Sequence, residues 1–187
     1  ATHPVGSFEI NSATCVDLEE VAQLAGLDFI LNVVTDCNDN IASLASGEPY
    51  NTWKENVASA RSLAEVEIQY KSDITIVSAG GVTHDRTLFD AIDALHSAYE
   101  ATEQGGVIVL MAECPDGVGP PGFIRGMSEC ASESEVKILS ETSFEIGLEK
   151  ARFFWNVLAS RKVIICSRLR ESLVKERFHC TAVKDPQ

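Results

Sequence analysis

DITIVSAGGVTHDRTLFDAID, residues 73–93, is the stretch of sequence that decides the predicted fold. It starts with an apolar run rich in β-branched residues, which is typical of a buried strand, and the run breaks at Gly80-Gly81. Thr83 or Asp85 can cap the helix that is predicted to follow, where apolar residues recur at helical spacing. A strand, a glycine turn and a helix in this order indicate one unit of a parallel α/β fold. In such folds ligands bind beyond the carboxyl ends of the strands.

The same alternation of short apolar runs and longer amphipathic segments continues along the chain. Strands are predicted near 28–34, 73–78, 107–111, 136–139 and 162–166, with short strands also possible at 41–45, as a hairpin partner, and at 180–183. Helices are predicted over 17–25, 50–63, 87–103, 143–158 and 168–176. We therefore predict an α/β protein, a Rossmann-like three-layer α/β/α sandwich with a mainly parallel sheet of about five strands, in a single domain over residues 1–187.

Composition and charge exclude several classes of partner. The 187 residues are 45% hydrophobic and 23% charged, and the net charge of −13 disfavours nucleic acid and anionic membrane surfaces. No apolar run approaches the roughly 18 residues of a membrane helix, and the first ten residues lack the pattern of a secretory signal. Six cysteines occur without a CxxC pair or zinc-ligand spacing, which favours free thiols. We expect a cytoplasmic protein with no nucleic-acid or membrane partner and no metal site of its own.

A candidate binding site lies where two predicted strands end. Gly80 and Gly81 follow the first strand and either form a plain turn or approach an anion or nucleotide. His84 and Asp85 come next: Asp85 either caps the helix or serves a function, and His84 is expected to be exposed. Glu113 directly follows the second strand, so its carboxylate either faces the ligand or accepts hydrogen bonds from loop amides.

Two further carboxylates belong to the helix that follows the glycine turn. Asp90 and Asp93 are three residues apart, so they share one helix face and are expected to project together toward the site. Such a pair can bind a cation or a basic group of a substrate, or it can form a solvated acidic face near a helix N-terminus. The candidate site therefore consists of the seven residues Gly80, Gly81, His84, Asp85, Asp90, Asp93 and Glu113.

Five stretches in one order resemble the C-terminal domain of the nickel-dependent lactate racemase family, whose members are nickel-pincer-nucleotide racemases and epimerases. These stretches are LAGLDFILNVV (24–34), DITIVSAGG with the following Asp (73–85), GGVIVLMAECPDGVG (105–119), FEIGLEKA (144–151) and KVIICS (162–167). The resemblance implies a two-domain parent, in which an N-terminal domain carries the nickel pincer nucleotide on histidines and a lysine. The motifs of that domain are absent from this sequence. We therefore expect no catalytic residue and no cofactor in this chain, and no activity from it alone.

The resemblance also implies a reaction and a set of partners. Family members take a hydride from C2 of a 2-hydroxy acid and return it to either face, while the C-terminal domain closes over the site. The expected partners are thus a small 2-hydroxy acid and the protein's own N-terminal domain. A free-standing Rossmann-like module that binds a small anion or a nucleotide without catalysis is the alternative, and a purely structural domain is a third interpretation.

The residues that would contact the substrate depart from the family pattern. Lactate racemases have a Gln and, three residues on, a Lys at the positions of Asp90 and Asp93. In the FEIGLEKA stretch Glu149 stands where members often have His, whereas Lys150 matches. Replacing a lysine with an acid reverses the local charge, so we expect poor racemisation of lactate and a substrate with a basic or polyhydroxyl group.

Overall fold

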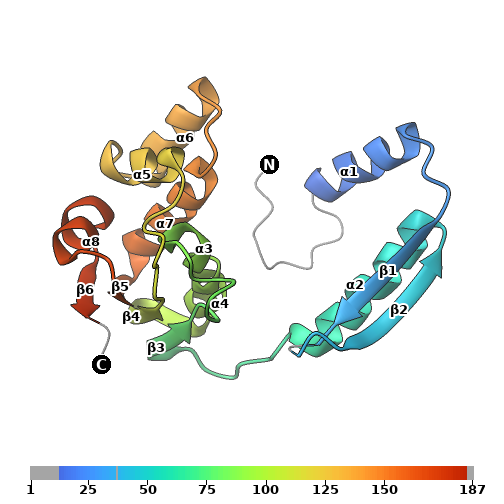
Figure 1. Cartoon of the computed structure of the whole chain (residues 1–187), viewed down its shortest axis with the longest axis horizontal. Coiled ribbons are helices and arrows are strands. Elements are labelled where there is room, and N and C mark those ends of the chain that lie inside the picture. The colour runs from blue at the N-terminus through green and yellow to red at the C-terminus, as the bar shows by residue number, and fades with distance from the viewer. Residues whose placement is uncertain (1–12, 37, 185–187) are drawn as a thin grey trace. The chain divides into compact units, whose positions relative to one another are not determined.

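The computed structural model describes residues 13–36 and 38–184, and these form two compact units (Figure 1). The first unit extends to Glu67, and the second begins at Ile68. The sequence analysis predicts one domain, whereas the described residues divide at this boundary. Each unit is therefore considered by itself. No helix among the described residues is long and apolar enough to cross a lipid bilayer.

The first unit is an antiparallel hairpin with two helices. Its elements are α1 (Ala13–Leu24), β1 (Ile30–Thr35), β2 (Ile41–Gly47) and α2 (Pro49–Ala64). The hairpin partner predicted at 41–45 is confirmed, because β1 pairs antiparallel with β2. The strand predicted near 28–34 therefore exists but does not join the parallel sheet. The carboxylate of Asp36 explains the return of the chain, since it accepts hydrogen bonds from the N–H groups of Asn38 (2.8 Å) and Asn40 (2.9 Å).

The second unit is a parallel α/β structure and holds all the candidate site residues. Its four strands are adjacent in the order β3 (Ser72–Ser78), β4 (Thr102–Met111), β5 (Lys162–Ser167) and β6 (Thr181–Lys184), and every pairing is parallel. Its helices are α3 (Leu88–Ala91), α4 (Ala94–Ala101), α5 (Pro121–Ser128), α6 (Glu133–Thr142), α7 (Leu148–Ser160) and α8 (Glu171–Phe178). The predicted α/β class and the mainly parallel sheet are confirmed, although this sheet has four strands where about five were expected.

The strand predicted at 136–139 is wrong, because these residues belong to α6. The hydroxyl of Ser132 caps α6 by accepting the Glu135 N–H, and Glu133 and Glu135 place negative charge in the first turn. Only Val136 of the helix is fully buried. The short apolar run therefore packs as one stripe of a capped helix, and run length alone does not distinguish the two structures.

The helix predicted over 87–103 is broken and ends early. The four-residue α3 is followed by α4, and α4 passes directly into β4 at Thr102 without a loop. Thr102 is fully buried, and its Oγ1 donates to the carbonyl oxygen of Ala98 (2.6 Å) and lies 2.7 Å from the Thr75 hydroxyl. The Thr102 carbonyl accepts two hydrogen bonds from Arg161. Contacts with residues distant in sequence thus fix the change from helix to strand, which helical periodicity does not reveal.

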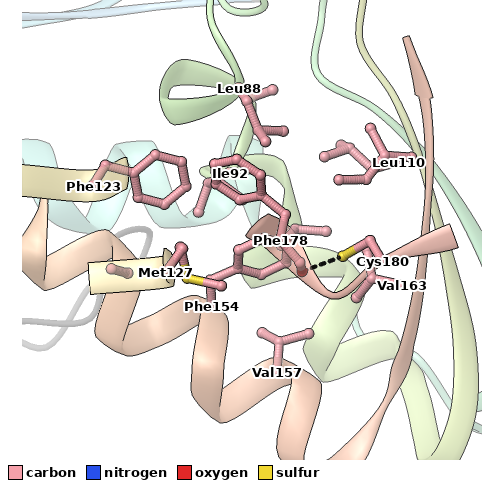
Figure 2. Packing of buried hydrophobic residues seen from close by; sticks show 14 of the residues in the cluster. Leu88, Ile92, Leu110, Phe123, Met127, Phe154, Val157, Val163, Phe178 and Cys180 are labelled. Carbon is pink, nitrogen blue, oxygen red and sulfur yellow. Dashed lines mark hydrogen bonds between the residues drawn. The ribbon is translucent and has the colours of Figure 1, made fainter. Parts of the chain in front are cut away.

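The core of the second unit lies between the sheet and its helices. Figure 2 shows Phe123 of α5, Phe154 of α7 and Phe178 of α8 gathered with Met127 and Ile92 at its centre. Helices α5 and α7 approach closely there, since a Cβ added at Gly126 would lie 2.6 Å from the Cβ of Ala151.

The two faces of the sheet differ in burial. Residues that point toward the helices, such as Ile108 and Ile165, are fully buried. On β3 the alternate residues Ile74 and Ile76 remain 62% and 68% exposed. The described helices of this unit therefore cover the face that carries Ile108 and Ile165.

Candidate functional site at the carboxyl ends of β3, β4 and β5

Asp85 connects the loops that follow β3 and β4. Its carboxylate is buried, with Oδ2 accepting the Glu113 N–H at 3.0 Å, and its main-chain carbonyl accepts the Cys114 N–H at 2.9 Å. Its Oδ1 is also buried and has no hydrogen-bond partner among the described residues. Glu113 continues the connection to β5, because its carbonyl accepts the Arg168 N–H (3.0 Å) and its carboxylate pairs with the Arg168 guanidinium (2.7 Å). Three strand ends are therefore joined through Asp85 and Glu113.

The cap of α3 is neither Thr83 nor Asp85, so that prediction is wrong. Thr87 caps the helix by accepting the Asp90 N–H at its hydroxyl oxygen (3.2 Å). Asp90 completes a capping box, because its Oδ2 accepts from the Thr87 N–H (3.1 Å) and hydroxyl (2.7 Å). The Asp90 carboxylate therefore has a structural role at the start of α3.

The glycine pair forms a turn that only glycine adopts easily. Gly80 and Gly81 have φ values of +104° and +87°, and the Gly81 carbonyl accepts the N–H groups of His84 (2.7 Å) and Asp85 (3.0 Å). The first helix after the turn begins at Leu88 and has four residues, so no helix N-terminus lies at the turn itself. His84 is exposed, as expected.

Asp93 has a partner that the sequence analysis did not foresee. Its Oδ1 lies 2.8 Å from the ammonium nitrogen of Lys150 on α7, and this nitrogen also donates to the Phe89 carbonyl oxygen at 2.9 Å. Asp90 and Asp93 thus interact with different partners, although both follow the glycine turn. The negative charge of Asp93 is balanced by a cation within the same unit, so the acidic pair is not a free double charge.

His96 lies beside this ion pair. Its ring stacks on Phe153 with a centroid distance of 3.6 Å and an interplanar angle of 9°. Burial lowers the pKa of the His96 imidazole, while the Asp93 carboxylate raises it and the Lys150 ammonium lowers it. The neutral ring is therefore favoured in the stack.

Cys114 carries a thiol that resists ionisation. It is buried and has a φ of +53°, and burial together with the carboxylates of Asp85, Asp90 and Glu113 raises the pKa of its thiol to about 12. Its N–H donates to the Asp85 carbonyl oxygen at 2.9 Å, which places the thiol at the start of the β4–α5 loop beside Asp85 and next to Glu113 in the chain. A thiol in such surroundings is a poor nucleophile near neutral pH.

The thiol of Cys114 also predicts a loss of stability in alkali. The pKa of the Cys114 thiol in the folded protein lies above its ordinary value of 9.0. The stability that depends on the neutral thiol is therefore fully present below pH 9 and is lost as the pH rises toward 12. We expect Cys114→Ala to reduce the fall in unfolding free energy between pH 9 and pH 12. Urea titrations of both proteins at several pH values measure this difference, and parallel curves would contradict the assignment. The variant keeps a Cβ at the left-handed backbone position, so backbone strain is matched.

Several charged residues of this region were missed. Arg168 pairs with Glu113, and Arg86 pairs with Asp116 at 2.6 Å. Lys150 matches the family pattern in sequence, but its contact with Asp93 joins residues far apart in the chain. Spacing carries no signal for such pairs, because the parallel topology alone brings their elements together.

The described residues contain no group of three or more His, Cys, Asp or Glu side chains that could hold a metal ion. Comparison with known proteins then identifies the fold. Residues 67–185 match the family model described as the lactate racemase C-terminal domain. The chain belongs to this family.

Two curated proteins are similar to this chain over longer or overlapping stretches. The chain is 31% identical over 174 residues to a lactate racemase from Thermoanaerobacterium thermosaccharolyticum, a match that covers 90% of this chain and 40% of the relative. It is 28% identical over 119 residues to a lactate racemase from Lactiplantibacillus plantarum, covering 64% of this chain and 28% of that protein. The chain thus spans less than half the length of these relatives.

Solved structures agree with the family assignment. The structure of the lactate racemase apoprotein from Thermoanaerobacterium thermosaccharolyticum superposes with a TM-score of 0.84 at 30% identity, over 94% of this chain and 43% of the other. A Thermotoga maritima protein superposes with a TM-score of 0.57 at 16% identity, over 83% of this chain and 42% of that one, which shows a shared fold alone. The resemblance drawn from the five sequence stretches is confirmed.

Proposed function

We propose that this chain is the substrate-side domain of a nickel-pincer-nucleotide-dependent racemase or epimerase of 2-hydroxy acids. When bound, the nickel pincer nucleotide would supply the acceptor for the C2 hydride while the C2 hydroxyl loses its proton. Return of the hydride to either face of the resulting 2-oxo acid, with return of the proton to its oxygen, would invert the centre. The observation that carries this proposal is the superposition on the lactate racemase apoprotein over 94% of the chain.

The described residues offer no group of three or more His, Cys, Asp or Glu side chains that could hold a metal ion, so no nickel site is proposed on them. We therefore assign the cofactor to the part of the longer relatives that lies outside their match with this chain. The proposed contribution of this chain is to bind and orient the substrate. It is expected to have no racemase activity alone.

The carboxyl ends of β3, β4 and β5 are the proposed substrate-facing surface. Asp85 and Glu113 hold three loops together there, and the capping box of Thr87 and Asp90 fixes the start of α3. The carboxylates at this surface already have partners within the chain: Asp85 and Asp90 accept hydrogen bonds, and Asp93 and Glu113 pair with Lys150 and Arg168. The proposed substrates are 2-hydroxy acids, with lactate expected to be a poor one because Asp93 stands where lactate racemases have a lysine.

Isotope retention tests the proposed reaction. The full-length protein, loaded with its cofactor, would be given one enantiomer of several 2-hydroxy acids labelled with deuterium at C2. We expect the opposite enantiomer, separated by chiral chromatography, to keep its deuterium, because the transferred hydride returns to the same carbon. Loss of the label to water would indicate proton abstraction and would contradict the proposal.

The isolated chain provides the second arm of this test. We expect no turnover from it under the same conditions. In equilibrium dialysis we expect no stoichiometric nickel site with a dissociation constant below about 1 μM, since ligand clusters are needed for tighter binding. A tight nickel site on the isolated chain would overturn the assignment of the cofactor to another part of the protein.

A further inference from the structure

Lys150 places a cation in a largely buried position. Its side chain is only 13% exposed, and its ammonium nitrogen lies 4.1 Å from the centroid of the Phe89 ring. The same nitrogen donates to the Phe89 carbonyl oxygen at 2.9 Å. The ring and the carbonyl hold the ammonium group in place but supply no negative charge. A buried cation of this kind needs an anion to compensate the loss of hydration.

Asp93, the carboxylate that pairs with Lys150, has few other contacts. Asp93 lies between α3 and α4, its side chain is 47% exposed, and it forms no side-chain capping bond to α4. Its carboxylate therefore has one strong attachment, the 2.8 Å contact with Lys150, and can enter water at little cost. An ion pair with such an exposed partner contributes little to stability.

We propose that Lys150 is a carboxylate-binding site in which Asp93 occupies the place of an external ligand. A small organic acid would bind by exchange: its carboxylate replaces that of Asp93 on the ammonium group, while the Phe89 ring and carbonyl keep that group oriented. The cation remains paired throughout, so no buried charge is exposed during the exchange. The identity of the acid as a 2-hydroxy acid rests on the proposed function, whereas the site itself does not.

The affinity of the site depends on competition between Asp93 and the incoming acid for the Lys150 ammonium group. Asp93 competes with the incoming acid, so wild-type binding is expected to be weak and to strengthen when this competitor is removed. Removing this ion pair is expected to improve affinity by up to about fivefold, the factor that corresponds to about 1 kcal/mol. The charges of Asp93 and Lys150 both affect the pKa of the neighbouring His96 imidazole. The titration is therefore done at pH 8, where His96 is neutral.

The experiment uses the 187-residue chain and sodium L-lactate as the probe. Backbone amide NMR spectra would be recorded during titration of the wild type and of Asp93→Asn, Lys150→Gln and Asp116→Asn. We expect saturable shifts around Phe89 and Lys150, up to about fivefold tighter binding in Asp93→Asn, and loss of binding in Lys150→Gln. Asp116→Asn is the matched control, because it frees an exposed arginine from its carboxylate partner and should bind as the wild type does.

Several outcomes would overturn the proposal. Among them are unchanged affinity in Asp93→Asn, retained binding in Lys150→Gln, and equal shifts with sodium chloride at the same ionic strength. If Lys150→Gln does not fold, Lys150→Arg replaces it and is expected to bind lactate at the same location. Wild-type shifts that map away from Phe89 and Lys150 would also refute the site. Lactate binding to the chain is measured without cofactor or turnover, so its failure is distinguishable from failure of the proposed reaction.

Discussion

Phe123→Ala is expected to lower the unfolding free energy of the second unit by about 4 kcal/mol. The Phe123 side chain is fully buried, and its ring lies 5.8 Å from that of Phe89, 6.5 Å from that of Phe154 and 5.5 Å from that of Phe178. Its loss removes the contact that joins α5 to α3, α7 and α8 at once and leaves a cavity in the close-packed centre (Figure 2). Urea denaturation followed by circular dichroism measures the change.

The chain contains a matched control for this substitution. Phe144 is 99% exposed, so Phe144→Ala removes the same atoms from water-exposed surface and is expected to change stability by less than about 0.5 kcal/mol. Equal effects of the two substitutions would show that Phe123 does not have the packing described here.

Arg161→Met is expected to destabilise the same unit by about 3 kcal/mol. Arg161 is 8% exposed and donates from Nε (3.1 Å) and Nη2 (2.9 Å) to the Thr102 carbonyl oxygen, with its guanidinium carbon 4.6 Å from the centroid of the Tyr99 ring. Methionine retains the apolar stem but leaves the buried carbonyl without its two donors. The melting temperature and the urea midpoint should both fall.

Arg177 provides the comparison for that change. It lies exposed on α8, and Arg177→Met removes the same guanidinium without uncovering a buried acceptor. We expect its effect to stay within about 0.5 kcal/mol. A loss in Arg161→Met no greater than this would mean that the buried hydrogen bonds contribute nothing to stability.

The sequence predicts those parts of the fold that depend on neighbouring residues. Strands β3, β5 and β6 and the hairpin of β1 with β2 appear as short apolar runs with turn residues between them, and the structure has them where expected. The α4–β4 junction was missed because Thr102 changes from helix to strand through a contact with Arg161, 59 residues away. Residues 136–139 are apolar enough to be predicted as a strand, but they lie within α6, whose first turn is capped by Ser132.

The candidate site shows the same limit. The expectation that loops after two strand ends meet is confirmed by the Asp85–Glu113 hydrogen bond, since parallel topology follows from the alternating pattern. The ion pair of Asp93 with Lys150 was not foreseen, because it depends on how α7 crosses the α3–α4 turn. Periodicity places residues on a helix face, whereas the partner of that face is set by packing between distant segments.

The direct passage from α4 into β4 has a consequence for local motion. A helix that ends in a loop can fray, and its last amides exchange with solvent faster than those of the core. Here the last turn of α4 continues into a residue whose side chain and carbonyl are both held in the interior. Deuterium exchange is therefore expected to be slow up to Ala101 and Thr102, at the rate of the central strand, so that helix and strand open as one cooperative segment.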